Sequence, residues 1–392
     1  MFSSRYFQAY GFWHAGEGFQ TILMMWYMAF HARLTAAEIG FYQSLQLLPF
    51  LILTALGGSL TDRLGARLSY SVSTGLFALT LGLYGLAEAA VGFSPWAFGA
   101  YCLFSGIFSA ISNPAIDTFI PEATPRPATD NALLAATVHN AAKLSGNLAT
   151  LLLPVLSALG GFVVNGLLMA LSVLRLRAHT NAPTITVRPK WQPPSPHRVA
   201  AHFRAFPESF DIFLGSVMLG AFVIPAYYIF HPMIMREHFP DRAALFGVTG
   251  AVGWVGAILA SGLAVRFASR LQHPGRWAML VWALAALLFF CTVLVGSFWA
   301  FLAILFLLGG NSVGKAMIYG HYLSDAPTAD RAFLIGVDQT AIWGLATIGT
   351  AALGWLVEVV GLRQAVLLDC GAVLLFVGYL LLRGRLWNLS AR

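Results

Sequence analysis

A histidine and a glutamate stand three residues apart in "FWHAGEGFQ" (residues 12–20), inside a long apolar stretch near the start of the chain. On a helix, His14 and Glu17 share one side, and Gln20 continues it. Glu17 lies twelve residues after Arg5, about 18 Å along a helix, so we expect it near the middle of a membrane span. Because a carboxyl group beside an imidazole can bind and release a proton, we predict a proton-coupling role for Glu17 and His14. The alternative is a hydrogen-bonded pair that only fixes helix packing.

Lysine is rare in this chain, and two of its three lysines, Lys143 and Lys315, lie inside apolar segments. A buried ammonium needs a negative partner, a water-filled cavity or a neutral form. We predict that Lys143 either offsets the charge of Glu17 or meets an anionic substrate. His139 and Asn140 precede Lys143 by four and three residues, on the same side of a helix. We therefore group these three residues as candidate substrate-binding residues, together with Gln20.

The second half of the chain has its own intramembrane charges. We predict a structural or gating pair between Lys315 and Asp338 and retain Asp338 as a further proton-coupling candidate and Lys315 as a substrate-binding candidate. Tyr27, Tyr227 and Trp254 are candidates for lining a substrate cavity, with core or lipid contact as the alternative for each aromatic side chain.

The amino-acid composition indicates whether the chain is a soluble or a membrane protein. The 392 residues are 58% hydrophobic and 10% charged, with a mean hydropathy of +0.73, whereas a soluble domain has about 25% charged residues. The net charge of +7 comes from basic residues scattered at the ends of apolar segments rather than gathered in a patch, which argues against a nucleic-acid partner. We predict an integral membrane protein, with no metal and no cofactor.

The apolar stretches predict an all-α protein with twelve transmembrane helices. A polar, proline-rich stretch at 179–208 separates two sets of six, giving bundles at 1–178 and 209–392. With both termini in the cytoplasm, seventeen basic residues lie inside and four outside, in accord with the positive-inside rule. We predict a multi-pass, monomeric protein of the bacterial cytoplasmic membrane. The segments are about 5–30, 37–60, 69–89, 94–117, 130–157, 160–178, 209–235, 243–265, 276–296, 298–322, 331–357 and 362–383.

Two short matches share an offset of 200 residues. "PATDNALL" at 127–134 resembles "PTADRAFL" at 327–334, and "WYMAFH" at 26–31 resembles "AYYIFH" at 226–231. Both fall at equivalent places in the two sets of six. Two parallel six-helix repeats are typical of one large class of secondary transporters, which bind substrate near the midplane between the halves.

The stretch "GGSLTDRLGARL" (57–68), in the predicted cytoplasmic loop between the second and third helices, resembles the signature of the major facilitator superfamily. The resemblance implies the twelve-helix fold and a role in latching the cytoplasmic side for the loop's charged residues. The stretch at 112–134 also resembles the connection between helices 4 and 5 of efflux-type members, including macrolide and siderophore exporters. The matching signature positions are Gly58, Leu60, Asp62, Arg63, Gly65 and Arg67.

The chain departs from the family pattern in two places, of which the second, in the fifth helix, bears on the direction of transport. Arg266 stands where the second-half counterpart of the signature has an acid, and "LSGNLATLLLP" lacks the paired glycines of antiporters. We predict a proton-coupled secondary transporter of a small drug-like or siderophore-like solute, with export favoured and import by symport as the alternative. No HExxH, GxSxG or GxxxxGK[ST] motif occurs, which argues against an intramembrane enzyme or an ATP-driven pump.

Overall fold

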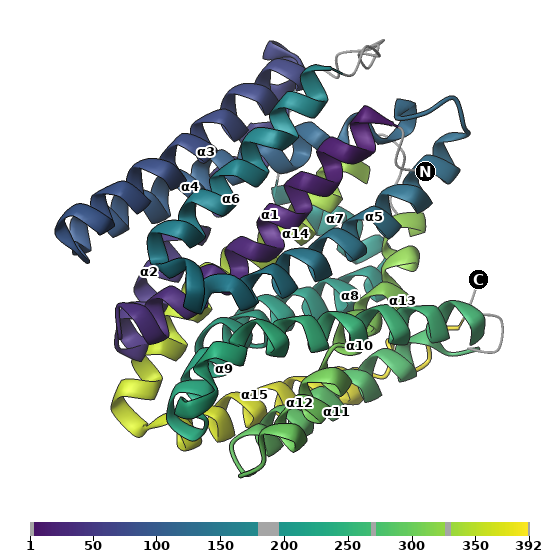
Figure 1. Ribbon diagram of the computed structural model, residues 1–392. Coiled ribbons are helices and arrows are strands. Elements are labelled where there is room, and N and C mark those ends of the chain that lie inside the picture. Colours follow the sequence, from purple (N-terminus) through teal and green to yellow (C-terminus); the bar gives the residue numbers. More distant parts are fainter. Residues whose placement is uncertain (1–3, 179–195, 268–271, 326–330, 391–392) are drawn as a thin grey trace. The chain divides into compact units, whose positions relative to one another are not determined.

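The computed structural model describes residues 4–178, 196–267, 272–325 and 331–390, and every regular element in these ranges is a helix (Figure 1). The chain forms two compact units. The first consists of Met1–Leu34, Tyr42–Trp191 and Asp241–Ala251, and the second of Thr35–Phe41, Gln192–Pro240 and Val252–Arg392. Two short segments, Thr35–Phe41 and Asp241–Ala251, are thus grouped with the opposite half of the sequence, and the bundles at 1–178 and 209–392 stay a prediction.

In the first unit, α1 packs against α5 and α6, and α3 packs against α4 and α6; Figure 1 shows α3 and α6 running side by side. A π-helical turn at Tyr27–His31 extends α1. Large aromatic side chains fill the space between these helices, among them Trp13, Phe77 and Phe162, all less than 2% exposed. The helices are α1 (Arg5–Trp26), α3 (Ala66–Val91), α4 (Pro95–Asp117), α5 (Ala128–Ala149) and α6 (Leu153–Arg177). α2 (Ala36–Leu64) belongs to this unit from Tyr42 onward.

In the second unit, α11 packs against α12, α13 and α15, while α14 packs against α8, α9 and α15. A second π-helical turn, Leu219–Val223, joins α8 to α9. The helices are α7 (Pro196–Ala205), α8 (Pro207–Met218), α9 (Ile224–His238), α11 (Pro274–Thr292), α12 (Phe298–Leu308), α13 (Asn311–Asp325), α14 (Arg331–Val360) and α15 (Leu362–Arg383). α10 (Phe246–Phe267) belongs to this unit from Val252 onward.

Nine helical stretches of the described residues are long and apolar enough to cross a membrane. One of them, Asp130–Arg177, has 48 residues, which at 1.5 Å per residue is about twice the thickness of a hydrocarbon core. It contains both α5 and α6. The chain is thus a multi-pass membrane protein, and the exact count of twelve crossings in two repeats stays a prediction.

The helix boundaries correct the sequence analysis at several points. The break between the fifth and sixth segments comes at a 3₁₀ turn, Thr150–Leu152, because Pro154 lacks a backbone N–H and suits the first turn of a new helix. The segment predicted at 298–322 is divided at Gly309–Gly310 into α12 and α13. The end of the predicted linker is helical, as α7, and its residues 179–195 lie outside the described part of the chain.

Candidate functional site

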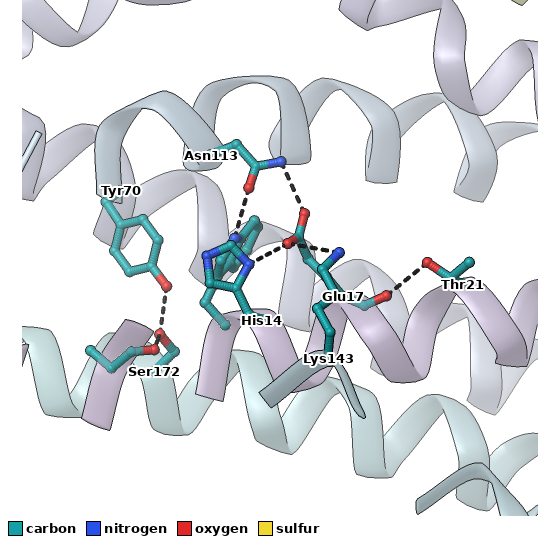
Figure 2. Close-up of polar contacts among 9 residues, drawn as sticks. His14, Glu17, Thr21, Tyr70, Asn113, Lys143 and Ser172 are labelled. Atoms are coloured by element: carbon teal, nitrogen blue, oxygen red, sulfur yellow. Dashed lines mark hydrogen bonds and ion pairs between the residues drawn. The ribbon is translucent and has the colours of Figure 1, made fainter. Parts of the chain in front are cut away.

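Glu17 is the centre of a polar cluster within the first unit (Figure 2). His14 Nδ1 lies 2.7 Å from Glu17 Oε2, and Lys143 Nζ lies 3.2 Å from the same oxygen. Asn113 Nδ2 donates to the other oxygen, Oε1, at 3.0 Å. The contact with His14 follows from the helical spacing, whereas Lys143 on α5 and Asn113 on α4 are brought in by packing. The structure therefore joins the predicted Glu17, His14 and Lys143 in one network.

Two glycines let α1 and α5 approach closely enough for the Glu17–Lys143 pair to form. A Cβ on Gly18 would lie 2.6 Å from the Lys143 carbonyl oxygen, and a Cβ on Gly146 would lie 2.0 Å from the Ala15 carbonyl oxygen. Each helix thus presents a glycine to the backbone of the other. Small residues at such crossings allow close helix packing inside a membrane. Here the crossing fixes the distance between the helices that carry the two charges.

Asn113 is a site residue that the sequence analysis did not assign. Its Oδ1 accepts a hydrogen bond from the buried Trp13 Nε1 at 2.8 Å, which orients the amide so that Nδ2 faces Glu17. The signal available in the sequence was a lone carboxamide in an apolar helix, next to Pro114. That signal gives no direction, because it does not indicate which neighbouring helix the amide faces.

Gln20 does not contact Glu17, although helical spacing puts both on one side of α1. Gln20 is 6% exposed and lies in a separate network, in which it donates to the Tyr101 hydroxyl and accepts from Asn165 Nδ2. These partners come from α4 and α6. A buried amide needs its hydrogen bonds satisfied, and this network supplies them for Gln20, whose part in substrate binding stays a prediction.

His139 and Asn140 lie on α5 one turn before Lys143, and both are partly exposed. The His139 ring lies 4.2 Å from the His14 ring, between centroids, so His139 belongs to the edge of the Glu17 cluster. The carboxylate, ammonium, imidazoles and amide here could bind a proton or a polar solute. The described residues contain no group of three His, Cys, Asp or Glu side chains suited to a metal ion.

Lys315 and Asp338 form the predicted pair in the second unit. Lys315 Nζ lies 2.5 Å from Asp338 Oδ2, and Ser216, which the sequence analysis did not assign, donates to Asp338 Oδ1 at 2.5 Å. The Asp338 side chain is fully buried and that of Lys315 is 15% exposed. The Lys315 ammonium also lies 4.8 Å from the Tyr319 ring centroid. Asp338 is thus held by both of its oxygens.

The three aromatic candidates lie in different surroundings. Tyr27 is fully buried, and its hydroxyl is 2.6 Å from that of Tyr84 in the aromatic core of the first unit. Tyr227 and Trp254, both partly exposed, belong to the second unit. The Tyr227 ring contacts the ring of His231, with centroids 5.2 Å apart.

The chain matches the sequence profile of the Major Facilitator Superfamily over residues 9–318. It belongs to this superfamily. Membership indicates a transporter rather than an enzyme. No curated protein sequence matches the chain significantly.

Solved structures of superfamily-type transporters share the fold at low sequence identity. The nucleoside transporter NupG is 14% identical, with a TM-score of 0.76 over 100% of both chains. A POT family transporter in complex with a thioalcohol-conjugated peptide is 12% identical, with a TM-score of 0.77 over 98% of this chain and 96% of its own. A bacterial homologue of the human lysosomal transporter Spinster is 14% identical, with a TM-score of 0.68 over 99% and 98%.

The superfamily signature lies at the junction of α2 and α3 and corrects the predicted loop at 57–68. The backbone is helical to Leu64 and again from Ala66, so Gly65 alone makes the turn. Its φ of 83° lies in the left-handed region, which glycine adopts without a Cβ penalty. Gly58, Asp62 and Arg63 lie on the last turns of α2, and nothing of their side chains is described. Arg67 follows in the first turn of α3 and is partly exposed.

Proposed function

We propose that this protein is a proton-coupled secondary transporter of a small organic solute in the bacterial cytoplasmic membrane, with both termini and the 179–208 linker in the cytoplasm. The observation that carries the proposal is the Glu17 cluster. A carboxylate in a span stays ionised only with compensation, which His14, Asn113 and Lys143 supply here. A proton arriving at Glu17 removes the negative charge and weakens the hold on Lys143. Proton binding can therefore bias one conformation over another.

Two solute classes and two directions follow from separate observations. The resemblance of residues 112–134 to efflux-type members supports export of a drug-like or siderophore-like solute. The missing glycine pair in the fifth helix and the paired Glu17 and Lys143 support uptake by symport instead. The nucleoside and peptide transporters among the structural neighbours add polar solutes to those worth testing.

Proton flux in reconstituted vesicles tests the coupling. Purified protein is incorporated with a pH-sensitive dye inside, and nucleosides, peptides, siderophores and cationic drugs are added in turn. We expect one class to move protons through the parent protein and none to do so through Glu17→Gln, because glutamine mimics the protonated acid. Glu88→Gln, on α3 and outside the cluster, is the matched control and should retain the flux. Parent-like flux in Glu17→Gln refutes the proton-coupling role.

Topology and direction need two further measurements. In a protein lacking Cys102, Cys291 and Cys370, a cysteine at His197 should label only from the cytoplasmic side and one at Glu237 only from outside. Labelling of the His197 position in intact cells contradicts the proposed orientation.

The direction of transport is tested by measuring accumulation of the active solute in cells with and without an uncoupler. If the protein exports the solute, the uncoupler raises the amount of solute in the cells. If the protein imports it, the uncoupler lowers that amount.

A further inference from the structure

Glu17 holds its three partners unequally. The contact with His14 is 2.7 Å and that with Asn113 is 3.0 Å, whereas the contact with Lys143 is 3.2 Å. His14 and Asn113 each engage a different carboxyl oxygen. Because of this division, both oxygens of Glu17 keep a hydrogen-bond partner when Lys143 moves away. Lys143 is the partner that the cluster can release.

Lys143 has donor capacity left over. An ammonium carries three N–H donors, and in the described part of the chain the ion pair of Lys143 is with the single oxygen Glu17 Oε2. The side chain is 17% exposed, as is that of Glu17, so both reach the boundary of the packed interior. Asn140, one turn earlier on α5, is also partly exposed and offers an amide beside the same surface. A negatively charged group of a solute can therefore approach Lys143.

The need for charge neutrality inside the bundle determines which charge a solute bound at the cluster should have. Ionised Glu17 and Lys143 together are neutral. When an anion pairs with the Lys143 ammonium, the cluster stays neutral only if Glu17 gains a proton. An ionised Glu17 would otherwise be a buried charge without its cation, which is costly. A cationic solute meets the opposite situation, because it would share the cluster with the Lys143 ammonium. The pair thus favours one anionic group together with one proton.

We propose, building on the proton-coupled function above, that Lys143 binds a carboxylate-like anionic group of the transported solute and that this anion and a proton occupy the Glu17 cluster together. The ion pair between Nζ and Oε2 is replaced by one between Nζ and the solute, and a proton from water binds Glu17. The protonated carboxyl donates to His14 Nδ1, with the imidazole proton on Nε2, and Asn113 still donates to Oε1. Binding a proton and a solute from the same side corresponds to symport.

Several titratable groups lie close enough to Glu17 to interact with it electrostatically. They come from α1 itself and from the three helices around it. They are His14 and Tyr10 on α1, Tyr70 on α3, Asp117 on α4, and Lys143 and His139 on α5.

Matched pairs of carboxylates and neutral amides test the solute class. Benzoate with benzamide, nicotinate with nicotinamide, and lactate with lactamide are titrated into purified protein, with thermal stabilisation and proton uptake from weak buffer as readouts. We expect at least one carboxylate to stabilise the protein with uptake of a proton, and its amide to do neither. Lys143→Gln should weaken carboxylate binding about tenfold to a hundredfold, the range for losing a charged hydrogen-bond partner. Lys190→Gln, in the linker, is the control with the same change of side chain.

Two variants keep the test decisive if Lys143→Gln fails to fold. Lys143→Arg keeps the positive charge and should retain the preference for carboxylate over amide. Glu17→Gln leaves Lys143 without its carboxylate and should bind the carboxylate at least as tightly as the parent, without taking up a proton. Equal binding of acid and amide, or no saturable carboxylate binding to Glu17→Gln, overturns the proposal. Proton flux driven only by neutral solutes refutes the anion site but is consistent with proton coupling. Carboxylate binding without any proton flux supports the anion site but refutes proton coupling.

Discussion

The close crossing of α1 and α5 provides the sharpest test of how packing positions the Glu17–Lys143 pair. Gly146→Ala adds a Cβ 2.0 Å from the Ala15 carbonyl oxygen and 2.8 Å from the Phe19 nitrogen. Both are backbone atoms, so no side chain can turn aside. A carbon–oxygen contact needs about 3.3 Å, and the helices must therefore separate by roughly 1.3 Å.

This separation acts on the ion pair. If the side chains follow their backbones, the distance from Lys143 Nζ to Glu17 Oε2 grows from 3.2 Å to about 4.5 Å. At an effective dielectric constant of about 20, the Coulomb attraction falls from about 5.2 to about 3.7 kcal/mol, a loss of about 1.5 kcal/mol. Overpacking adds about 1–3 kcal/mol, partly offset by the higher helix propensity of alanine, about 1 kcal/mol. We expect lower thermal stability and at least a tenfold slower proton flux.

The matched control is Gly82→Ala on α3. It makes the same substitution in a helix of the same unit, but its added Cβ meets nothing within 4 Å. Melting curves and dye-monitored flux are measured for parent, Gly146→Ala and Gly82→Ala at equal amounts of reconstituted protein. If Gly146→Ala matches Gly82→Ala in both measurements, the crossing does not set the geometry of the pair and the reasoning fails.

Three further variants probe other parts of the chain. Asp338→Asn leaves Lys315 facing a neutral amide and should destabilise the second unit by about 3–5 kcal/mol. Adding Lys315→Met should restore the stability, and a melting curve unchanged by Asp338→Asn contradicts this prediction. Tyr84→Phe removes the hydroxyl partner of buried Tyr27 and should cost about 1–3 kcal/mol with transport per folded molecule unchanged; a selective loss of transport would instead assign these tyrosines to the site. Asp62→Asn should impair transport at normal expression if the signature residues latch the cytoplasmic side, and normal transport rates would remove Asp62 from the mechanism.

The sequence by itself determined the class of protein and the local part of the site. Too few charged residues are present to coat a globule, so the helices had to be membrane spans, and the signature at 57–68 pointed to the superfamily. Helical periodicity also predicted the His14–Glu17 contact, because residues three apart on a helix are neighbours whatever surrounds them. Helical periodicity does not select the partners of Gln20, which come from α4 and α6, since the side chain of a helix residue can turn toward either of two neighbouring helices and only packing selects one.

Tertiary structure decided the rest of the site. Lys143 is 126 residues from Glu17 and Asn113 is 96 residues away, and no periodicity relates residues on different helices. Their approach depends on Gly18 and Gly146, whose missing side chains let two backbones touch. Which of the buried polar residues share a cluster follows from these few close crossings, because a polar group inside a membrane protein takes the partners that packing brings within hydrogen-bond distance.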